Sequence, residues 1–179
     1  GRTDLRHLPF VTIDPADARD FDDAVCLVNQ TLWIAIADVA SYVPLGTALD
    51  RAARARATSV YLPHTVLPML PPRLADDLCS LRAQVDRRAM VLEIPVQEGG
   101  LGTPLAHEAI VKVHANRTYD DVLDDAAFAP LMALAARLRE DDLRLQLHNA
   151  ELRPRLHDDD RLTVEIKRPN EATAMIETL

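Results

Sequence analysis

Residues 8–37 have the sequence LPFVTIDPADARDFDDAVCLVNQTLWIAIA, in which three short apolar runs surround an acidic segment. The runs are Phe10 to Ile13, Ala24 to Val28 and Leu32 to Ala37, and short apolar runs bounded by polar residues predict strands. The last two are separated by Asn29-Gln30-Thr31, a spacing typical of a hairpin. The acidic segment is therefore expected to be a loop attached to a rigid scaffold.

The rest of the chain mixes expected strands and helices. They are a helix over 48–57 capped by Thr47, an extended loop over 61–72 imposed by four prolines, a short helix over 74–81, paired strands over 90–96 and 106–114, a helix over 130–148, a strand over 161–166 and the start of a helix over 171–179. This pattern predicts an α/β fold with a mixed β-sheet and flanking helices. Because the chain has no initiating Met and ends inside an expected helix, we expect residues 1–179 to be a piece of a longer polypeptide and the fold to be incomplete.

Composition excludes several classes of protein. The 179 residues are 48% hydrophobic and 27% charged, which rules out a disordered chain. No apolar run approaches the roughly 18 residues that span a bilayer, so a cytoplasmic protein without a membrane partner is expected. Cys26 and Cys79 form no CxxC motif and are interpreted as small buried hydrophobic residues. The net charge of −8 argues against a non-specific polyanion binder, because affinity for phosphate backbones comes largely from Lys and Arg.

Half of that net charge lies between residues 14 and 23, where five aspartates accompany one arginine. Carboxylates this close repel one another unless a cation lies among them. Oxygen ligands select Mg²⁺ or Mn²⁺, and two such ions can activate water for phosphodiester hydrolysis. The alternative is a solvated loop of turn-forming aspartates. A calcium loop is disfavoured because the EF-hand order of ligands and glycine is absent.

Several sequence blocks carry a more specific resemblance. They are Leu8-Pro9-Phe10-Val11-Thr12-Ile13-Asp14, Ala18-Arg19-Asp20-Phe21-Asp22-Asp23-Ala24, Ile36-Ala37-Asp38-Val39, Tyr61-Leu62-Pro63, Pro68-Met69-Leu70-Pro71 and Leu78-Cys79-Ser80-Leu81. Together they resemble the N-terminal part of the RNB catalytic domain of the ribonuclease II and ribonuclease R family. The resemblance implies an exoribonuclease that hydrolyses single-stranded RNA processively from the 3′ end, with Mg²⁺, to nucleoside 5′-monophosphates.

The resemblance also implies roles for the aspartates. Asp14, Asp20, Asp22 and Asp23 match the four motif aspartates, whereas Asp17 matches none. We place Asp14, Asp20 and Asp23 mainly on metal and Asp22 on the metal-bound water or its activation.

Two tyrosines are candidate RNA contacts. Tyr61, held by an extended Tyr-Leu-Pro segment, resembles one jaw of the clamp on the terminal nucleotide, and the alternative is a strand tyrosine packed on the core. Tyr119 matches a tyrosine that lines the RNA path, and its alternative is an aromatic at a helix start packed on Val122.

Three further residues have weaker assignments. Glu177 resembles a glutamate close to the RNA ribose, although a lone helical Glu is usually solvated. Arg19 is a candidate phosphate contact, with neutralisation of a neighbouring aspartate slightly favoured. Asp38 is either part of its matched block's site or a turn former at a strand end.

The chain also departs from the family pattern. A second clamp aromatic is expected shortly after His148-Asn149, where the sequence Ala150-Glu151-Leu152-Arg153-Pro154 has none. The arginine-bearing block that binds the scissile phosphate is not matched, and cold-shock-like and S1-like barrels are expected to flank this segment in the full polypeptide. These residues alone are therefore expected to form an incomplete RNA channel, with doubtful activity.

Two alternatives of other classes stay open. One is a catalytically inactive RNA-binding or regulatory relative, which the intact aspartate set disfavours. The other is a structural divalent-metal-binding protein.

Overall fold

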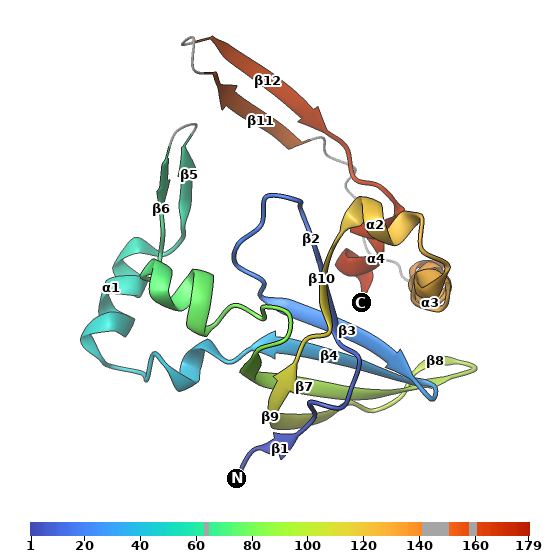
Figure 1. The fold of residues 1–179 in the computed structure, drawn as a ribbon. Helices are drawn as coiled ribbons and strands as arrows, with labels where there is room; N and C mark the ends of the chain where they lie inside the picture. The colour runs from blue at the N-terminus through green and yellow to red at the C-terminus, as the bar shows by residue number, and fades with distance from the viewer. Residues whose placement is uncertain (63–64, 141–150, 158–160) are drawn as a thin grey trace.

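The computed structural model describes residues 1–62, 65–140, 151–157 and 161–179 (Figure 1). The strands are β1 (Thr3–Asp4), β2 (Val11–Asp14), β3 (Asp23–Val28), β4 (Thr31–Ala37), β5 (Val60–Leu62), β6 (Thr65–Leu67), β7 (Asp86–Gln97), β8 (Gly100–Leu101), β9 (Leu105–Lys112), β10 (Ala115–Thr118), β11 (Glu151–Leu156) and β12 (Leu162–Lys167). The helices are α1 (Ala48–Arg56), α2 (Tyr119–Leu123), α3 (Ala129–Glu140) and α4 (Glu171–Thr178), and shorter 3₁₀ or π segments are η1 (Val39–Ser41), η2 (Arg73–Leu78) and η3 (Ala126–Phe128).

Eight strands form one mixed sheet in the order β1-β9-β7-β4-β3-β2-β10, with β8 paired to β7. The outer pairs β1–β9 and β10–β2 are parallel, and the other pairs are antiparallel. Two separate hairpins, β5–β6 and β11–β12, stand away from this sheet (Figure 1). The predicted α/β class with a mixed sheet and flanking helices is confirmed.

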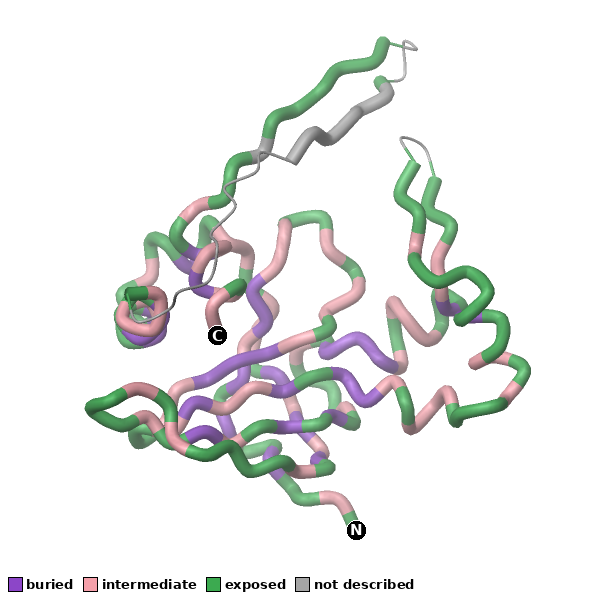
Figure 2. Tube along the Cα trace, turned by 180° about the vertical axis from the view of Figure 1, so that it is seen from behind, coloured by how far each residue is buried: buried purple, intermediate pink, exposed green. Residues whose placement is uncertain are grey.

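Alternation along the strands gives the sheet two packed faces, because successive side chains of a strand point to opposite sides. On one face, Val25 and Leu32 pack with buried residues of α2, α3 and α4. On the other, Cys26 and Ala35 pack with Phe10 and Leu81, which come from segments outside the strands. Figure 2 shows these buried stretches running through the centre of the sheet, whereas β5, β6 and β12 are exposed. Burial of each large apolar side chain contributes about 1.5–3 kcal/mol, so the two cores make the sheet a firm base for its loops.

The predicted hairpin between the second and third apolar runs is also confirmed. Asn29 and Gln30 form its turn with φ of 50° and 57°. Two successive positive φ values suit a tight hairpin turn whose twist matches that of its strands.

The prediction of an extended loop over 61–72 is wrong, because β5 and β6 form an antiparallel hairpin there. Pro68 follows the last residue of β6, and Pro63 lies outside the described residues. Pro68 therefore bounds the hairpin instead of interrupting a strand.

Other boundaries differ from the expectations. The expected helix over 74–81 is the shorter η2, and the residues after it run into the core. The expected helix over 130–148 is confirmed as α3 up to Glu140, and residues 141–150 lie outside the described part. Strands β1, β8, β10 and β11 were not predicted. No helix in the described ranges is long and apolar enough to cross a membrane.

Both cysteines are buried and unpaired, as expected. Desolvation by the surrounding protein raises the pKa of the Cys26 thiol and that of Cys79. Both thiols are therefore protonated at neutral pH, which is the state of an inert buried side chain.

Candidate active site

The acidic segment connects two neighbouring strands of the sheet. Asp14 is the last residue of β2 and Asp23 is the first of β3, so both carboxylates are positioned by strands. Asp20 and Asp22 lie in the loop that rises from this edge of the sheet (Figure 1). On the other side of β2, Thr118 at the end of the parallel strand β10 is aligned with Asp14. The fold thus brings the predicted aspartates to one end of the neighbouring strands β2 and β3.

Asp14 has the most strongly perturbed carboxyl group of the four. Its pKa is raised to about 6, first by desolvation on burial and then by the charges of Asp23, Asp22 and Asp20, while a hydrogen bond with Thr12 acts in the opposite direction. One of its oxygens, Oδ2, is buried without a hydrogen-bond partner. A buried carboxylate oxygen without a partner has lost its bound water, and no protein hydrogen bond replaces that water. The carboxylate is therefore stabilised by binding a proton or a cation.

The pKa values of Asp22 and Asp23 are also raised, in both cases first by desolvation. For Asp22 the charges of Asp20 and Asp23 add to the effect. The four carboxylates therefore interact as one electrostatic group, in which each added negative charge makes the next harder to hold.

Two observations test whether this group fits a divalent metal. The donors are carboxylate oxygens, the type that Mg²⁺ and Mn²⁺ prefer, and the unpartnered oxygen of Asp14 offers an unused ligand. In the described parts of the chain, however, no three His, Cys, Asp or Glu side chains are close enough together to hold a metal ion. The donor chemistry and the electrostatics fit a metal, while the side chains are not arranged as a closed coordination shell.

Tyr61 connects the hairpin β5–β6 to the acidic loop. Its hydroxyl lies 3.4 Å from Oδ2 of Asp20, a long hydrogen bond that it donates. The side chain is nevertheless 69% exposed, so the ring is not packed in the core as the alternative reading required. Desolvation, and then the charges of Asp20, Asp22 and Asp76, raise the pKa of the Tyr61 hydroxyl. An exposed ring beside an acidic group is therefore available to a ligand.

The structure separates the weaker candidates. Tyr119 begins α2 and packs against the buried cluster that contains Val122, which is the packing alternative named for it. Glu177 is an exposed residue of α4, and the Arg19 side chain is exposed on the acidic loop. Asp38 is buried, caps η1 by accepting a hydrogen bond from the Ser41 amide at 3.1 Å and pairs with Arg2, which is a structural role.

Sequence reasoning missed the residues that support the loop. Thr12 beside Asp14 is fully buried, and its hydroxyl accepts a hydrogen bond of 2.9 Å from the Asn116 side chain of β10. Ser80, also fully buried, hydrogen-bonds the loop backbone. Asp76 is close enough to raise the pKa of Tyr61. Thr12 and Ser80 lie in two of the sequence blocks that carry the family resemblance, but the sequence did not indicate their contacts, because these join residues far apart in the chain.

Comparisons with known proteins agree with this architecture. The model of the RNB domain family matches residues 2–179. Ribonuclease R of Escherichia coli strain K12 is 53% identical over 128 residues, which cover 68% of this chain and 16% of that protein. A solved Mycoplasma genitalium RNase R in complex with ribose methylated single-stranded RNA is 27% identical, with a TM-score of 0.89 over 99% of this chain and 31% of its own.

A more distant structure shows how far the fold extends. A yeast pseudonuclease is 16% identical, with a TM-score of 0.67 over 78% of this chain and 19% of its own, and that likeness concerns the fold alone. The chain spans less than a third of the length of each of these proteins. The family match over nearly all of its residues, supported by the identity to ribonuclease R, shows that the chain belongs to the RNB domain family.

Proposed function

We propose that this chain provides the catalytic aspartates of a 3′-to-5′ exoribonuclease that hydrolyses single-stranded RNA, processively and with Mg²⁺, to nucleoside 5′-monophosphates. The observation that carries the proposal lies where β2 ends and β3 begins: the charges of Asp20, Asp22 and Asp23 help to raise the pKa of Asp14, and a buried oxygen of Asp14 lacks a hydrogen-bond partner. Membership of the RNB domain family and the similarity to ribonuclease R support the same activity.

In this proposal Asp14, Asp20 and Asp23 hold Mg²⁺, with Mn²⁺ as a second choice, and Asp22 orients the attacking water. Bound metal would supply charge neutralisation and an activated water. The strand ends fix Asp14 and Asp23, while the loop backbone fixes Asp20 and Asp22. The raised pKa of Asp22 makes its carboxylate a stronger base than an ordinary aspartate, which would favour acceptance of a proton from the water.

Metal binding also accounts for the acidic net charge of a protein proposed to bind RNA. Two divalent cations would add a charge of +4 and cancel the −4 of residues 14–23, so the edge that repels phosphate without metal would accept it with metal.

Tyr61 is proposed to stack on the terminal base, because its ring is exposed while its hydroxyl lies 3.4 Å from Oδ2 of Asp20. Arg19, Tyr119 and Glu177 stay secondary candidates for RNA contact. Tyr119 is half-buried and is therefore less accessible to RNA than Tyr61. The solved relative with single-stranded RNA supports this class of ligand.

Two features of the full-length protein belong to the same proposal. Cold-shock-like and S1-like barrels would flank residues 1–179, which would form the N-terminal part of the catalytic domain, and the protein would act in the cytoplasm. Completion of the RNA channel would depend on residues outside this chain, including the arginine-bearing block.

The inactive RNA-binding relative is the second candidate, because the fold itself also occurs in a pseudonuclease. The fold alone therefore does not show whether the chain is active. The presence of the four motif aspartates is the feature that favours activity. A chain without catalytic activity would have no physical reason to keep these carboxylates together, because burial raises the pKa of Asp14, Asp22 and Asp23 and the neighbouring charges raise those of Asp14 and Asp22 further.

The deciding experiment follows a 5′-labelled single-stranded RNA incubated with the full-length natural protein, with Mg²⁺ or with EDTA. We expect shortening from the 3′ end only with Mg²⁺, mononucleoside 5′-phosphates as product, and no attack on DNA of the same sequence. Binding of the RNA without shortening would instead identify the inactive relative. Stabilisation by Ca²⁺ with neither binding nor shortening would identify a structural metal protein.

A further inference from the structure

We propose that Ser80 is a positioning residue, which holds Asp20 in place by hydrogen-bonding the backbone on both sides of it. The inference rests on the proposed function, because it concerns how an aspartate of that site is held. It adds a residue from a distant segment, 60 positions along the chain, to the machinery of the site.

The two hydrogen bonds of the Ser80 hydroxyl bracket Asp20. Oγ of Ser80 donates to the carbonyl oxygen of Arg19 at 3.0 Å and accepts from the amide of Phe21 at 3.1 Å. Ser80 is fully buried, so water does not compete for either bond. The residue between these two backbone groups is Asp20, whose backbone is therefore fixed at both of its neighbours.

Further bonds hold the same half of the loop. The amide of Leu81 donates to the carbonyl oxygen of Phe21 at 2.8 Å. The amide of Ala37 donates to the carbonyl oxygen of Asp22, also at 2.8 Å. Phe21 is therefore held through both its amide and its carbonyl. The loop that carries Asp20 and Asp22 is thus pinned to the core at successive residues, although it contains no regular structure.

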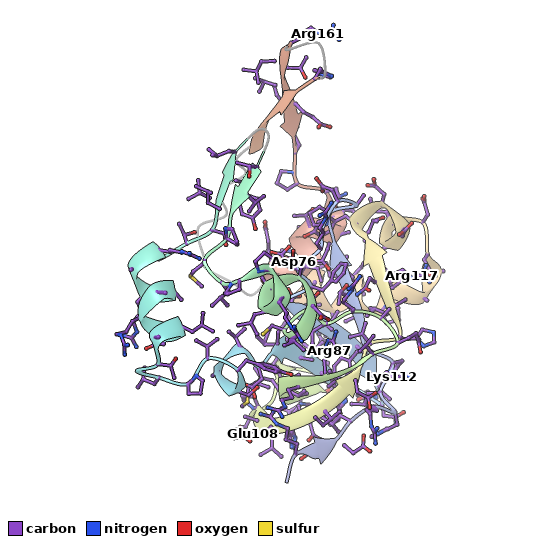
Figure 3. All side chains as sticks on the ribbon, turned by 60° about the vertical axis from the view of Figure 1, so that its left-hand side comes forward. Asp76, Arg87, Glu108, Lys112, Arg117 and Arg161 are labelled. Atoms are coloured by element: carbon purple, nitrogen blue, oxygen red, sulfur yellow. The ribbon has the colours of Figure 1, made fainter. Side chains whose placement is uncertain are left out.

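The backbone of Ser80 is in turn hydrogen-bonded by the side chain of Arg87 of β7. The guanidinium donates from Nε to the carbonyl oxygen of Ser80 at 2.9 Å and from Nη2 to Oδ1 of Asp77 at 3.0 Å. Figure 3 labels Arg87 below η2, between that segment and the sheet. The support therefore runs from the sheet through Arg87 and Ser80 to the backbone of Asp20.

The chemistry of the position favours serine. A hydroxyl both donates and accepts, as the two backbone partners require, and alanine does neither. Loss of the hydroxyl would leave the Arg19 carbonyl and the Phe21 amide without partners next to a charged residue. A displacement of Asp20 by about 1 Å would then suffice to lower the rate by up to 10²-fold, since catalysis depends on the placement of reacting groups.

The test compares Ser80→Ala with the wild type in the full-length protein. We expect kcat for single-stranded RNA to fall about 10- to 100-fold while KM stays within about 2-fold, because Asp20 is displaced but the RNA-binding surface is kept. In the protein without metal or RNA, we expect hydrogen exchange at the Phe21 amide to accelerate at least about 10-fold, since its acceptor is gone.

Ser41→Ala is the matched control. It also removes a serine hydroxyl that is bonded to a backbone carbonyl, that of Asp38 at 2.8 Å. We expect it to lower the unfolding temperature without changing kcat or the exchange of Phe21. An equal loss of kcat in both variants would overturn the proposal, because it would reduce the effect to general destabilisation.

Unchanged kcat in folded Ser80→Ala, or an unchanged exchange rate at Phe21, would also overturn it. If Ser80→Ala does not fold, Ser80→Cys takes its place, because a thiol has similar shape but is a weak donor and acceptor. If the wild type fails to shorten RNA, the proposed function fails, while the exchange measurement still decides whether Ser80 holds the loop.

Discussion

Asp14 is the residue in which the conflict between folding and chemistry is clearest. It ends a core strand, and the residue before it, Ile13, is almost fully buried. Its position raises the pKa of the carboxyl to about 6, so the folded protein holds its charge at a cost. Below the unfolded pKa of about 3.8 both states are protonated and the cost vanishes; it grows as pH rises and is complete above about 6.

Asp14→Asn is therefore expected to stabilise the protein without metal. At pH 8 the free energy of unfolding should rise by up to about 3 kcal/mol, and at pH 4 by less than about 1 kcal/mol, because the variant removes a charge that only the folded state disfavours. Urea unfolding of both proteins in EDTA at the two pH values measures this. A destabilised variant at pH 8 would contradict the account.

Tyr61 separates the contribution of a ring from that of its hydroxyl. Tyr61→Ala should weaken binding of a single-stranded RNA by about 1–3 kcal/mol, because a stacked base loses its platform, whereas Tyr61→Phe should bind nearly as the wild type does. Fluorescence anisotropy with a labelled oligonucleotide measures both. Leu67→Ala is a suitable control, since Leu67 is an exposed hydrophobic residue of the same hairpin that pairs with Val60 and not with Tyr61. Equal weakening by Leu67→Ala would remove the specific role of Tyr61.

Most strands with a clear local pattern were predicted from the sequence, whereas β10, which depends on a distant partner, was not. Alternation and short apolar runs predicted β2, β3, β4, β7, β9 and β12, because such patterns act within a few residues. By contrast, β10 follows β9 after only two residues yet pairs in parallel with β2 at the other edge of the sheet. Its sequence, Ala115-Asn116-Arg117-Thr118, has no strand pattern, so the partner strand and the Asn116 bonds determine it.

Asn116 is expected to be the most sensitive polar residue of this edge. Its side chain donates to Thr12 at 2.9 Å and to the Leu81 carbonyl at 3.1 Å and accepts from the Ala83 amide at 2.8 Å. Because three bonds are lost at once, Asn116→Ala should lower the free energy of unfolding by about 2–4 kcal/mol. Asn170→Ala, which removes only the cap of α4, should cost about 1 kcal/mol. Urea unfolding compares them, and equal costs would show that Asn116 does not connect the segments.

The molecule as a whole combines a firm double-faced sheet with a concentration of like charge at one edge. Sequence alone located that charge, because the aspartates lie within ten residues. It did not reveal the burial of the Asp14 oxygen, the contact between Tyr61 and Asp20 or the support from Ser80, because each depends on how remote segments pack. The roles proposed for the aspartates come from the family resemblance, because their spacing alone fits either a metal site or a solvated loop.

Divalent metal should therefore stabilise the folded protein, since it binds the folded carboxylates and not the dispersed ones of the unfolded chain. At pH 8 we expect the unfolding temperature to rise with MgCl₂ compared with NaCl of equal ionic strength. The rise should shrink below about pH 6, as Asp14 takes up a proton. Thermal unfolding of the full-length protein at both pH values measures it, and an equal rise in Asp14→Asn would exclude Asp14 as a ligand.

The central claim is that the motif aspartates carry out metal-dependent hydrolysis of RNA. Its most direct measurement is the rate at which full-length Asp22→Asn and Asp17→Asn shorten a 5′-labelled single-stranded RNA in Mg²⁺, with RNA affinity measured in parallel. Asp22 shares the electrostatic group of Asp14, whereas Asp17 lies in the same loop and matches no motif position. We predict a loss of at least about 100-fold for Asp22→Asn with affinity within about 2-fold, and a wild-type rate for Asp17→Asn. Unchanged hydrolysis by Asp22→Asn would contradict the account.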